Sequence, residues 1–115
     1  MLASRKREAL EELAADIDGE TFVFPAHAGK VDDARACIAA TLEHFGSLDI
    51  LVNNAATNPY YGRTLGVNES QFDKTFEVNL RGPLFWCQVA YQSWMKQHPG
   101  VILNIASVGG MRGVA

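Results

Sequence analysis

The feature that most constrains this chain is an apolar run over residues 48–53 that ends in the sequence Asn53-Asn54-Ala55-Ala56. A strand that alternates polar and apolar residues has one face in water, whereas a near-continuous apolar strand is typical of a parallel sheet with both faces covered. Residues 101–105, behind a Pro-Gly pair, form a second run of the same kind. The two runs therefore predict buried parallel strands in an α/β fold.

Helical and extended patterns alternate along the rest of the chain. Residues 1–3 form the end of a strand, and a helix is expected over residues 5–17 because its apolar residues recur on one face. Residues 21–24 are expected to form a strand that Pro25 stops, since proline cannot donate to a ladder. A second helix begins near Asp32 and Asp33 and ends at Gly46. This order indicates a single α/β domain with a parallel sheet.

A third helix is expected over residues 69–95, and it carries more apolar residues than one stripe can hold. Such a helix is buried on two sides, so we expect one side to cover the sheet and the other to meet a partner subunit. Pro83 lies inside this helix, and its missing N–H would have bonded the carbonyl of Asn79. One interpretation is a kink tolerated for packing. Because the chain also carries Asn53-Asn54 and Ser107, we prefer a water-binding or relay role for the Asn79 carbonyl.

The composition argues against several classes of protein. The 115 residues carry a formal net charge of -3, whereas a nucleic-acid partner needs a basic face. No apolar run reaches the length of a transmembrane helix, so no membrane partner is expected. Cys37 and Cys87 lie far apart among apolar residues, which indicates free thiols in a reducing compartment and a cytoplasmic protein. No His or Cys pair has the spacing of a metal site, so no metal is expected.

Three motifs, taken in order, resemble the short-chain dehydrogenase/reductase family. They are Leu51-Val52-Asn53-Asn54-Ala55-Ala56 after a strand, Val78-Asn79-Leu80-Arg81-Gly82 in a helix, and Ile102-Leu103-Asn104-Ile105-Ala106-Ser107 after another strand. Two further segments are similar to its NADP(H)-dependent carbonyl and retinal reductase branch: His27-Ala28-Gly29-Lys30 and Asn58-Pro59-Tyr60-Tyr61-Gly62. The resemblance covers the whole chain.

This resemblance implies that residues 1–115 are the central part of one NAD(P)-binding Rossmann domain, a doubly wound parallel sheet. The first strand with its glycine-rich loop and the C-terminal strands and helices are absent from the chain. In the usual strand order of this fold, the absent first strand and the shortened second lie between the strands at residues 21–24 and 48–53. The retained strands are therefore not all expected to be neighbours.

The resemblance also implies an active site. A serine placed like Ser107 hydrogen-bonds the oxygen of an alcohol or carbonyl substrate, and the carbonyl of an asparagine placed like Asn79 holds a water that links the catalytic lysine to solvent. The turn Asn53-Asn54-Ala55-Ala56 passes beside the adenosine part of the cofactor, where small side chains let the backbone approach. Two positions depart from the family pattern. Ala56 replaces the usual final glycine, and Ala28 stands where an aspartate often bonds adenine.

Ser4, Arg5 and Lys6 follow the first strand, where the family distinguishes NAD from NADP. An acid at this place accepts from the ribose 2′-hydroxyl, whereas arginine and lysine bind a 2′-phosphate through charge-assisted hydrogen bonds. Cations also oppose the dipole at a helix start unless an anion lies nearby. A solvated basic turn is the alternative, but because no acid precedes Glu8 we expect NADP(H) in preference to NAD(H).

Part of the family's catalytic machinery is absent from the chain. No Tyr-x-x-x-Lys pair occurs in the 115 residues, so we expect these residues alone to be inactive. The complete protein is expected to act on a small carbonyl or alcohol as a homodimer or homotetramer. The main alternative is an inactive fragment or degenerate relative that serves as a folding or interaction unit. A phosphate loop over residues 108–113 is a weaker alternative, because Val108 occupies the place of the first glycine.

Overall fold

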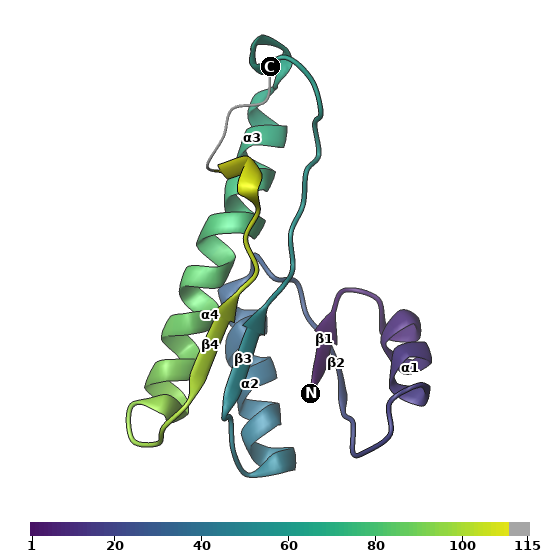
Figure 1. The fold of residues 1–115 in the computed structure, drawn as a ribbon, viewed down its shortest axis with the longest axis vertical. Coiled ribbons are helices and arrows are strands. Elements are labelled where there is room, and N and C mark those ends of the chain that lie inside the picture. Colours follow the sequence, from purple (N-terminus) through teal and green to yellow (C-terminus); the bar gives the residue numbers. More distant parts are fainter. Residues whose placement is uncertain (111–115) are drawn as a thin grey trace.

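The structure is a computed structural model that describes residues 1–110, and its strands and helices alternate along the chain (Figure 1). The strands and α-helices are β1 (Leu2–Ser4), α1 (Arg7–Ala15), β2 (Val23–Pro25), α2 (Val31–Phe45), β3 (Ile50–Asn53), α3 (Glu69–Phe76), α4 (Gly82–Ala90) and β4 (Val101–Asn104). Short 3₁₀ turns occupy Thr64–Gly66 and Val108–Gly110, and π-helical turns occupy Glu77–Arg81 and Tyr91–Met95. The alternation that the sequence predicts is confirmed.

The four strands form two separate parallel pairs. β1 pairs with β2, with Leu2 opposite Val23, and β3 pairs with β4, with Asn53 opposite Asn104. Within the described residues no ladder joins the two pairs, and Figure 1 shows β1 beside β3 with both strands running in the same direction. This separation agrees with a partial doubly wound sheet in which a strand position lies between them.

β2 ends at Pro25 itself, whereas the sequence predicted that the proline would lie just beyond the end of the strand. Pro25 lies opposite Ser4. The N–H of Ala26 donates to the carbonyl of Ser4 at 2.8 Å, so bonding to β1 continues past the proline. In a parallel ladder alternate residues bond to opposite sides, and the nitrogen of Pro25 therefore faces away from β1. An edge strand tolerates proline in that position.

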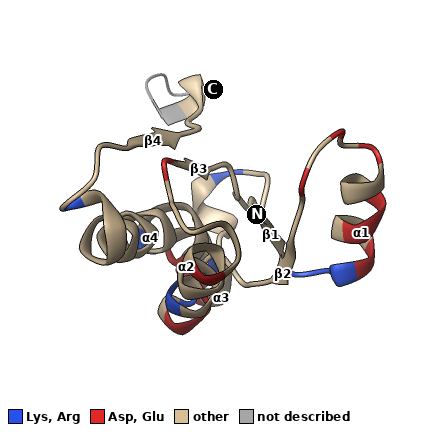
Figure 2. Ribbon diagram, turned by 90° about the horizontal axis from the view of Figure 1, so that it is seen from below, with Lys and Arg blue, Asp and Glu red and all other residues tan. Residues whose placement is uncertain are grey.

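Helices lie on both sides of the strands, as in a doubly wound fold. Figure 2 shows α2 and α4 on one side and α1 on the other. The main core lies between α2, α4 and β3, and its members are buried and apolar: Ile38, Leu48, Leu51, Val89 and Ala90. The helix α2 ends at Phe45, and Gly46 caps it in a left-handed conformation with φ of 75°.

The opposite face of β3 and β4 is not covered by any described residue. Ile50 is 61% exposed and Val52 is 50% exposed, and Val101 and Leu103, opposite them in register, are similarly open. The prediction that both faces of these strands are covered is therefore wrong for residues 1–110. The contacts among residues 1–110 do not cover this apolar face.

The long helix predicted over residues 69–95 is continuous but not uniform. It opens with a capping box between Asn68 and Gln71, and one π-helical turn over Glu77–Arg81 precedes α4. In that turn the N–H of Gly82 donates to the carbonyl of Glu77, five residues earlier, and Pro83 follows in the first turn of α4. A π turn of this kind is common at functional sites.

Only one side of this helix is buried. Val78, Gly82, Val89 and Ala90 are buried toward α2 and the strands, whereas the opposite side is exposed. The contacts among residues 1–110 thus bury one side of this helix, whereas the sequence predicted burial of two sides. The exposed apolar residues on that side are Phe72, Phe76, Leu80, Leu84 and Tyr91.

Candidate functional site

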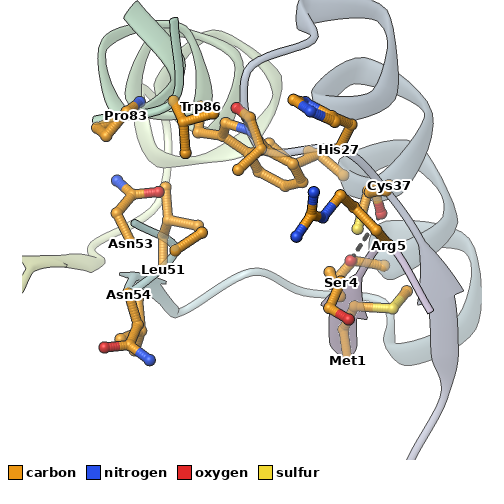
Figure 3. Close-up of a pocket in the computed structure, with 18 of the residues that line it drawn as sticks. Met1, Ser4, Arg5, His27, Cys37, Leu51, Asn53, Asn54, Pro83 and Trp86 are labelled. Carbon is orange, nitrogen blue, oxygen red and sulfur yellow. Dashed lines mark hydrogen bonds between the residues drawn. The ribbon is translucent and has the colours of Figure 1, made fainter. Parts of the chain in front are cut away.

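A cavity of about 990 Å³ lies between the two strand pairs. Its walls come from β1, β3, α2 and α4, and Figure 3 shows side chains from these elements pointing into it. The cofactor-binding residues expected from the sequence all line this one cavity, although they come from three separate parts of the chain. They are Ser4, Arg5, Lys6, Ala28, Asn53, Asn54, Ala55 and Ala56.

The two asparagines after β3 have different surroundings. The amide nitrogen of Asn53 donates to the Oδ1 of Asn104 at 2.9 Å and to the sulfur of Cys87 at 3.4 Å. These bonds hold Asn53 toward β4 and α4. Figure 3 shows Asn54 pointing the other way, as expected for consecutive residues of an extended segment. Asn53 therefore has a positioning role, and the small residues after Asn54 leave the backbone open to the cavity.

The side chain of Asn79 fixes the backbone of this same turn. Its Oδ1 accepts from the N–H of Thr57 and its Nδ2 donates to the carbonyl of Thr57, each at 2.8 Å. Thr57 lines the cavity, whereas Asn79 does not. The π turn carries Asn79, so the helix and the loop after β3 are joined at that point. The sequence predicted a role for the carbonyl of Asn79, whereas the contacts seen in the structure are made by its side-chain amide.

The loop after β2 is held closely against the long helix. The indole N–H of Trp86 donates to the carbonyl of Ala28 at 2.9 Å. A Cβ placed on Gly82 would lie 2.5 Å from that carbonyl oxygen, so only glycine allows the helix to approach this loop. Ala28 lines the cavity, and its carbonyl is directed toward the long helix. Its methyl group offers no bond of the kind that an aspartate would make.

Three ionisable side chains gather beside this loop. The Nζ of Lys74 lies 2.9 Å from the Nε2 of His27 and donates to the Oε2 of Glu77 at 2.9 Å. The hydrogen bond from Lys74 lowers the pKa of Glu77. The Nδ1 of His27 accepts from the N–H of Gly29 at 3.0 Å. His27 and Lys74 both line the cavity, so this wall carries polar groups, and Lys74 belongs to none of the quoted motifs.

The opposite end of the cavity is cationic. Arg5 and Lys6 are exposed at the start of α1, and Lys6 is its N-cap without any side-chain cap bond. The hydroxyl of Ser4 accepts from the N–H of Lys6 at 3.5 Å, the only side-chain bond there among the described residues. Figure 3 shows Arg5 in the cavity. Open backbone donors, a helix dipole and two cations together favour an anion such as a phosphate.

The floor of the cavity is formed by α2. Cys37 is buried there, and burial raises the pKa of its thiol to about 11. A thiol of this kind is inert as a nucleophile, because the thiolate is the reactive form. Cys37 is therefore a packing residue. This agrees with the sequence prediction of a free buried cysteine, whereas Cys87 is only partly buried.

Ser107 lies outside the lining of the cavity. It is exposed, and its hydroxyl accepts from the N–H of Gly109 at 3.1 Å. The structure thus brings together the residues that were expected to bind the cofactor but does not bring Ser107 to them. Met111–Gly113, the second half of the alternative phosphate loop, lies outside the described residues. Among residues 1–110 no group of His, Cys, Asp and Glu is arranged to hold a metal ion.

The residues that the sequence did not indicate are those that hold the site in place. Thr57, Trp86 and Lys74 belong to none of the quoted motifs, and they contact Asn79, Ala28 and His27, which lie 22, 58 and 47 residues away in the sequence. One signal was present: Gly82 within a helical pattern is costly for the helix and suggests a packing reason. None of the helices among residues 1–110 is both long and apolar enough to cross a bilayer.

Comparison with known proteins adds an independent line of observation. A family model described as short chain dehydrogenase matches residues 1–115. An uncharacterized oxidoreductase of Thermotoga maritima is 39% identical over 114 residues, which cover 98% of this chain and 44% of that protein. The 2-(R)-hydroxypropyl-CoM dehydrogenase of Xanthobacter autotrophicus is 43% identical over 81 residues, or 69% of this chain and 32% of that enzyme.

The solved structures agree. The crystal structure of levodione reductase superposes with a TM-score of 0.92 at 30% sequence identity, covering 98% of this chain and 46% of that one. The human dehydrogenase/reductase SDR family member 4 is 29% identical over 111 residues, or 94% of this chain and 40% of that protein. The chain thus spans less than half the length of the relatives that it matches.

Proposed function

The chain belongs to the short-chain dehydrogenase family, and from that premise we propose that the whole protein is an oxidoreductase that transfers a hydride between NADP(H) and a small alcohol or carbonyl substrate. The observation that carries this proposal is the meeting of eight family-motif residues around one cavity whose α1 end is cationic. The family supplies the reaction class. The cationic end supplies the preference for a cofactor with a 2′-phosphate.

Each part of the cavity then has a task. Arg5, Lys6 and the open N-terminus of α1 bind the 2′-phosphate on the ribose. The backbone after Asn54, fixed through Thr57, lies against the adenosine. The bound nicotinamide supplies the hydride chemistry. In the complete protein Ser107 binds the substrate oxygen, and the carbonyl of Asn79 holds a water of the proton path. The Tyr-x-x-x-Lys pair of the family is not within residues 1–115, so these residues alone are expected to be inactive.

Substrate class, assembly and location complete the proposal. One relative is named a levodione reductase and another a 2-(R)-hydroxypropyl-CoM dehydrogenase, which supports a small alcohol or carbonyl without identifying it. The exposed apolar side of the long helix supports a homodimer or homotetramer. Two free cysteines in the described residues support a reducing compartment, and we propose the cytoplasm.

The cofactor preference is tested by titrating the whole protein with NADPH and NADH and following nicotinamide fluorescence. We expect tighter binding of NADPH. Because a charge-assisted hydrogen bond contributes about 1.5–3 kcal/mol, Arg5→Ala together with Lys6→Ala should weaken NADPH at least ~100-fold and NADH only slightly. Arg35→Ala is the matched control, since Arg35 is an exposed cation paired with Asp32 on α2. Equal or tighter binding of NADH by the unmodified protein contradicts the proposal.

The role of Ser107 is tested separately. In the whole protein Ser107→Ala should lower carbonyl reduction by roughly 10²–10³-fold, the loss typical when one donor to a developing oxyanion is removed. Affinity for NADPH should stay within about twofold, because Ser107 does not line the cavity that we assign to the nucleotide. Near-normal turnover of a reducible ketone or aldehyde by the variant would reject this assignment.

The alternative function as a folding or interaction unit also has an observation in its favour. The described chain leaves unpaired strand edges and an apolar sheet face, both of which take up other segments readily. If the whole protein binds NADPH but reduces none of a broad panel of ketones and aldehydes, this alternative is preferred over the enzyme.

A further inference from the structure

The strands β3 and β4 end in the same residue type at the same register. β3 ends at Asn53 and β4 ends at Asn104, and the two asparagines lie opposite each other in the parallel ladder. Asparagine is depleted in strands, so the strand structure alone does not explain two of them side by side. Both lie at the carboxyl ends of parallel strands, where the functional groups of an open α/β sheet collect.

A third residue, Cys87 of α4, joins the two asparagines in a cluster that we call the junction. The Nδ2 of Asn53 donates to the Oδ1 of Asn104 at 2.9 Å and to the sulfur of Cys87 at 3.4 Å. The thiol of Cys87 donates to the same Oδ1 at 4.0 Å. Both protons of the Asn53 amide therefore have an acceptor, and exchanging its nitrogen and oxygen would lose both bonds. Asn53 is thus the donor of the junction, and Asn104 is its acceptor.

The junction lies between two segments with different proposed tasks. Asn53 immediately precedes the turn over residues 54–56, which lines the cavity assigned to the nucleotide. Asn104 precedes Ser107 by three residues and does not line that cavity. The backbones of the two segments are also joined, since the N–H of Ile105 donates to the carbonyl of Asn53 at 3.0 Å. The contact of Asn104 with the nucleotide side of the site therefore runs through Asn53.

We propose that Asn104 is a positioning residue, which acts through Asn53 to set the place of Ser107 relative to the turn over residues 54–56. This inference rests on the hydride transfer proposed above. In that reaction the substrate oxygen is bound on one segment and the cofactor on the other, so the reacting carbons meet correctly only when the segments keep their spacing. Misplacement of a reacting group by about 1 Å can lower a rate about 10²-fold.

The surroundings of the junction favour positioning over stability. Asn104 and its bond to Asn53 are exposed to water. A hydrogen bond in such a place replaces one to water, so its net contribution to the free energy of unfolding is small. Its effect on the rate is not limited in the same way, because the bond fixes the spacing of the two segments. We therefore expect loss of the Asn104 acceptor to lower kcat strongly and the melting temperature only slightly.

The kinetic experiment uses the whole protein, NADPH and a reducible ketone. Asn104→Leu keeps the approximate shape of the side chain and removes the acceptor, so kcat should fall roughly 10–100-fold, while the KM for the ketone and the affinity for NADPH stay within about threefold. Asn104→Asp keeps an acceptor oxygen in the place of Oδ1 and should retain kcat within about threefold. Gln97→Leu is the matched control, because it changes an exposed amide side chain before β4 in the same way.

A double variant tests whether Asn104 acts through Asn53. If it does, Asn53→Leu combined with Asn104→Leu should lower kcat by about as much as the more damaging single change. Losses that multiply would mean that the two residues act independently, and this result would overturn the proposal.

Amide hydrogen exchange of the whole protein reports on the junction without any turnover. The amides of Ile105 and Thr57 each donate one hydrogen bond, and they report on the Ser107 segment and on the turn after Asn53. In the Asn104→Leu variant both amides should exchange at least ~3-fold faster, because local opening of the two segments becomes easier. The amide of Val101, which is bonded at the far end of the same ladder, is the internal control.

Three further results would overturn the proposal. The first is a kcat of Asn104→Leu within about twofold of that of the unmodified protein. The second is a loss in Asn104→Asp as large as that in Asn104→Leu, which would show that the acceptor is not what matters. The third is unchanged exchange in either segment. If the unmodified protein reduces no ketone, the proposed hydride transfer fails by itself, and the exchange experiment alone then decides whether Asn104 positions the two segments.

Discussion

The side-chain amide of Asn79 and the backbone of Thr57 form a reciprocal pair of hydrogen bonds, each 2.8 Å long. This pair joins the π turn of the long helix to the loop that follows β3. Because the loop carries Asn54, Ala55 and Ala56 along the cavity, the position of its backbone depends on Asn79. The π turn and the turn after Asn53 are thus one structural unit.

Asn79→Asp tests this unit with little change in size. The aspartate keeps an acceptor for the N–H of Thr57 but places a second oxygen against the carbonyl of Thr57. One hydrogen bond is lost and a repulsion is added at an exposed position, so we expect a loss of about 1–2 kcal/mol in the free energy of unfolding. The amide of Thr57 should also exchange faster. Asn58→Asp is the matched control, since no described contact uses the Asn58 side chain, and a similar loss there would contradict the argument.

Gly82→Ala sets helix propensity against packing. Alanine in place of glycine stabilises a helix by about 1 kcal/mol in the absence of contacts. Here its Cβ would meet the carbonyl oxygen of Ala28 at 2.5 Å, and overpacking of this kind typically costs about 1–3 kcal/mol. We expect the steric term to exceed the propensity gain and the melting temperature to fall. Gln92→Ala, an exposed change on the same helix, should move it little; a stabilised Gly82→Ala variant would show that the loop yields easily.

The elements of this fold are predictable from sequence because their signals are local. The helix ending at Gly46 and the apolar strand over Leu48–Asn53 follow from residues within a few positions of one another, and both are confirmed with small shifts of their ends. The gathering of Ser4 to Lys6, Ala28 and the Asn53 turn at one cavity follows from the rule that functional groups collect at the carboxyl ends of parallel strands.

The contacts that position these groups were not predictable. Trp86 and Ala28 are 58 residues apart, His27 and Lys74 are 47 apart, and Thr57 and Asn79 are 22 apart. Such pairs depend on how helices dock, which periodicity does not specify. Pro25 shows the same limit. Its effect on the strand depends on whether its nitrogen faces the neighbouring strand or the edge, and only the register decides this.

Cys37 gives a prediction about pH. Its folded pKa of about 11 lies above the unfolded value of 9.0, so the folded state holds the proton more tightly. The raised pKa contributes about 2–3 kcal/mol to the free energy of unfolding. This contribution is fully present below pH 9 and is lost as the pH rises toward 11. Urea unfolding from pH 8 to 11 should therefore show a steeper decline for the unmodified chain than for Cys37→Ala. Cys87→Ala should keep the steep decline, and parallel curves for all three proteins would contradict the prediction.

The last prediction concerns assembly through the exposed side of the long helix. Phe76, Leu80 and Leu84 line a groove there, and Leu80 is 61% exposed. Asp73 and Glu77 lie on its rim together with Arg81. A two-fold symmetric contact is self-complementary, so the acids of one subunit can meet the arginine of the other while the apolar residues fill the centre.

We therefore expect the whole protein to form at least a dimer through this helix, and Leu80→Lys to weaken it. The substitution places an uncompensated cation in the buried centre of the interface, where the desolvation of a charge costs several kcal/mol, whereas in the isolated chain the position is open to water. Analytical ultracentrifugation at micromolar concentration should show a dimer or tetramer for the unmodified protein and a shift toward monomer for the variant. Tyr61→Lys is the matched control, because Tyr61 is 93% exposed and lies on the loop before the helix. A monomer for the unmodified protein would mean that this helix face is covered within its own chain, and an unchanged oligomer for Leu80→Lys would place the interface elsewhere.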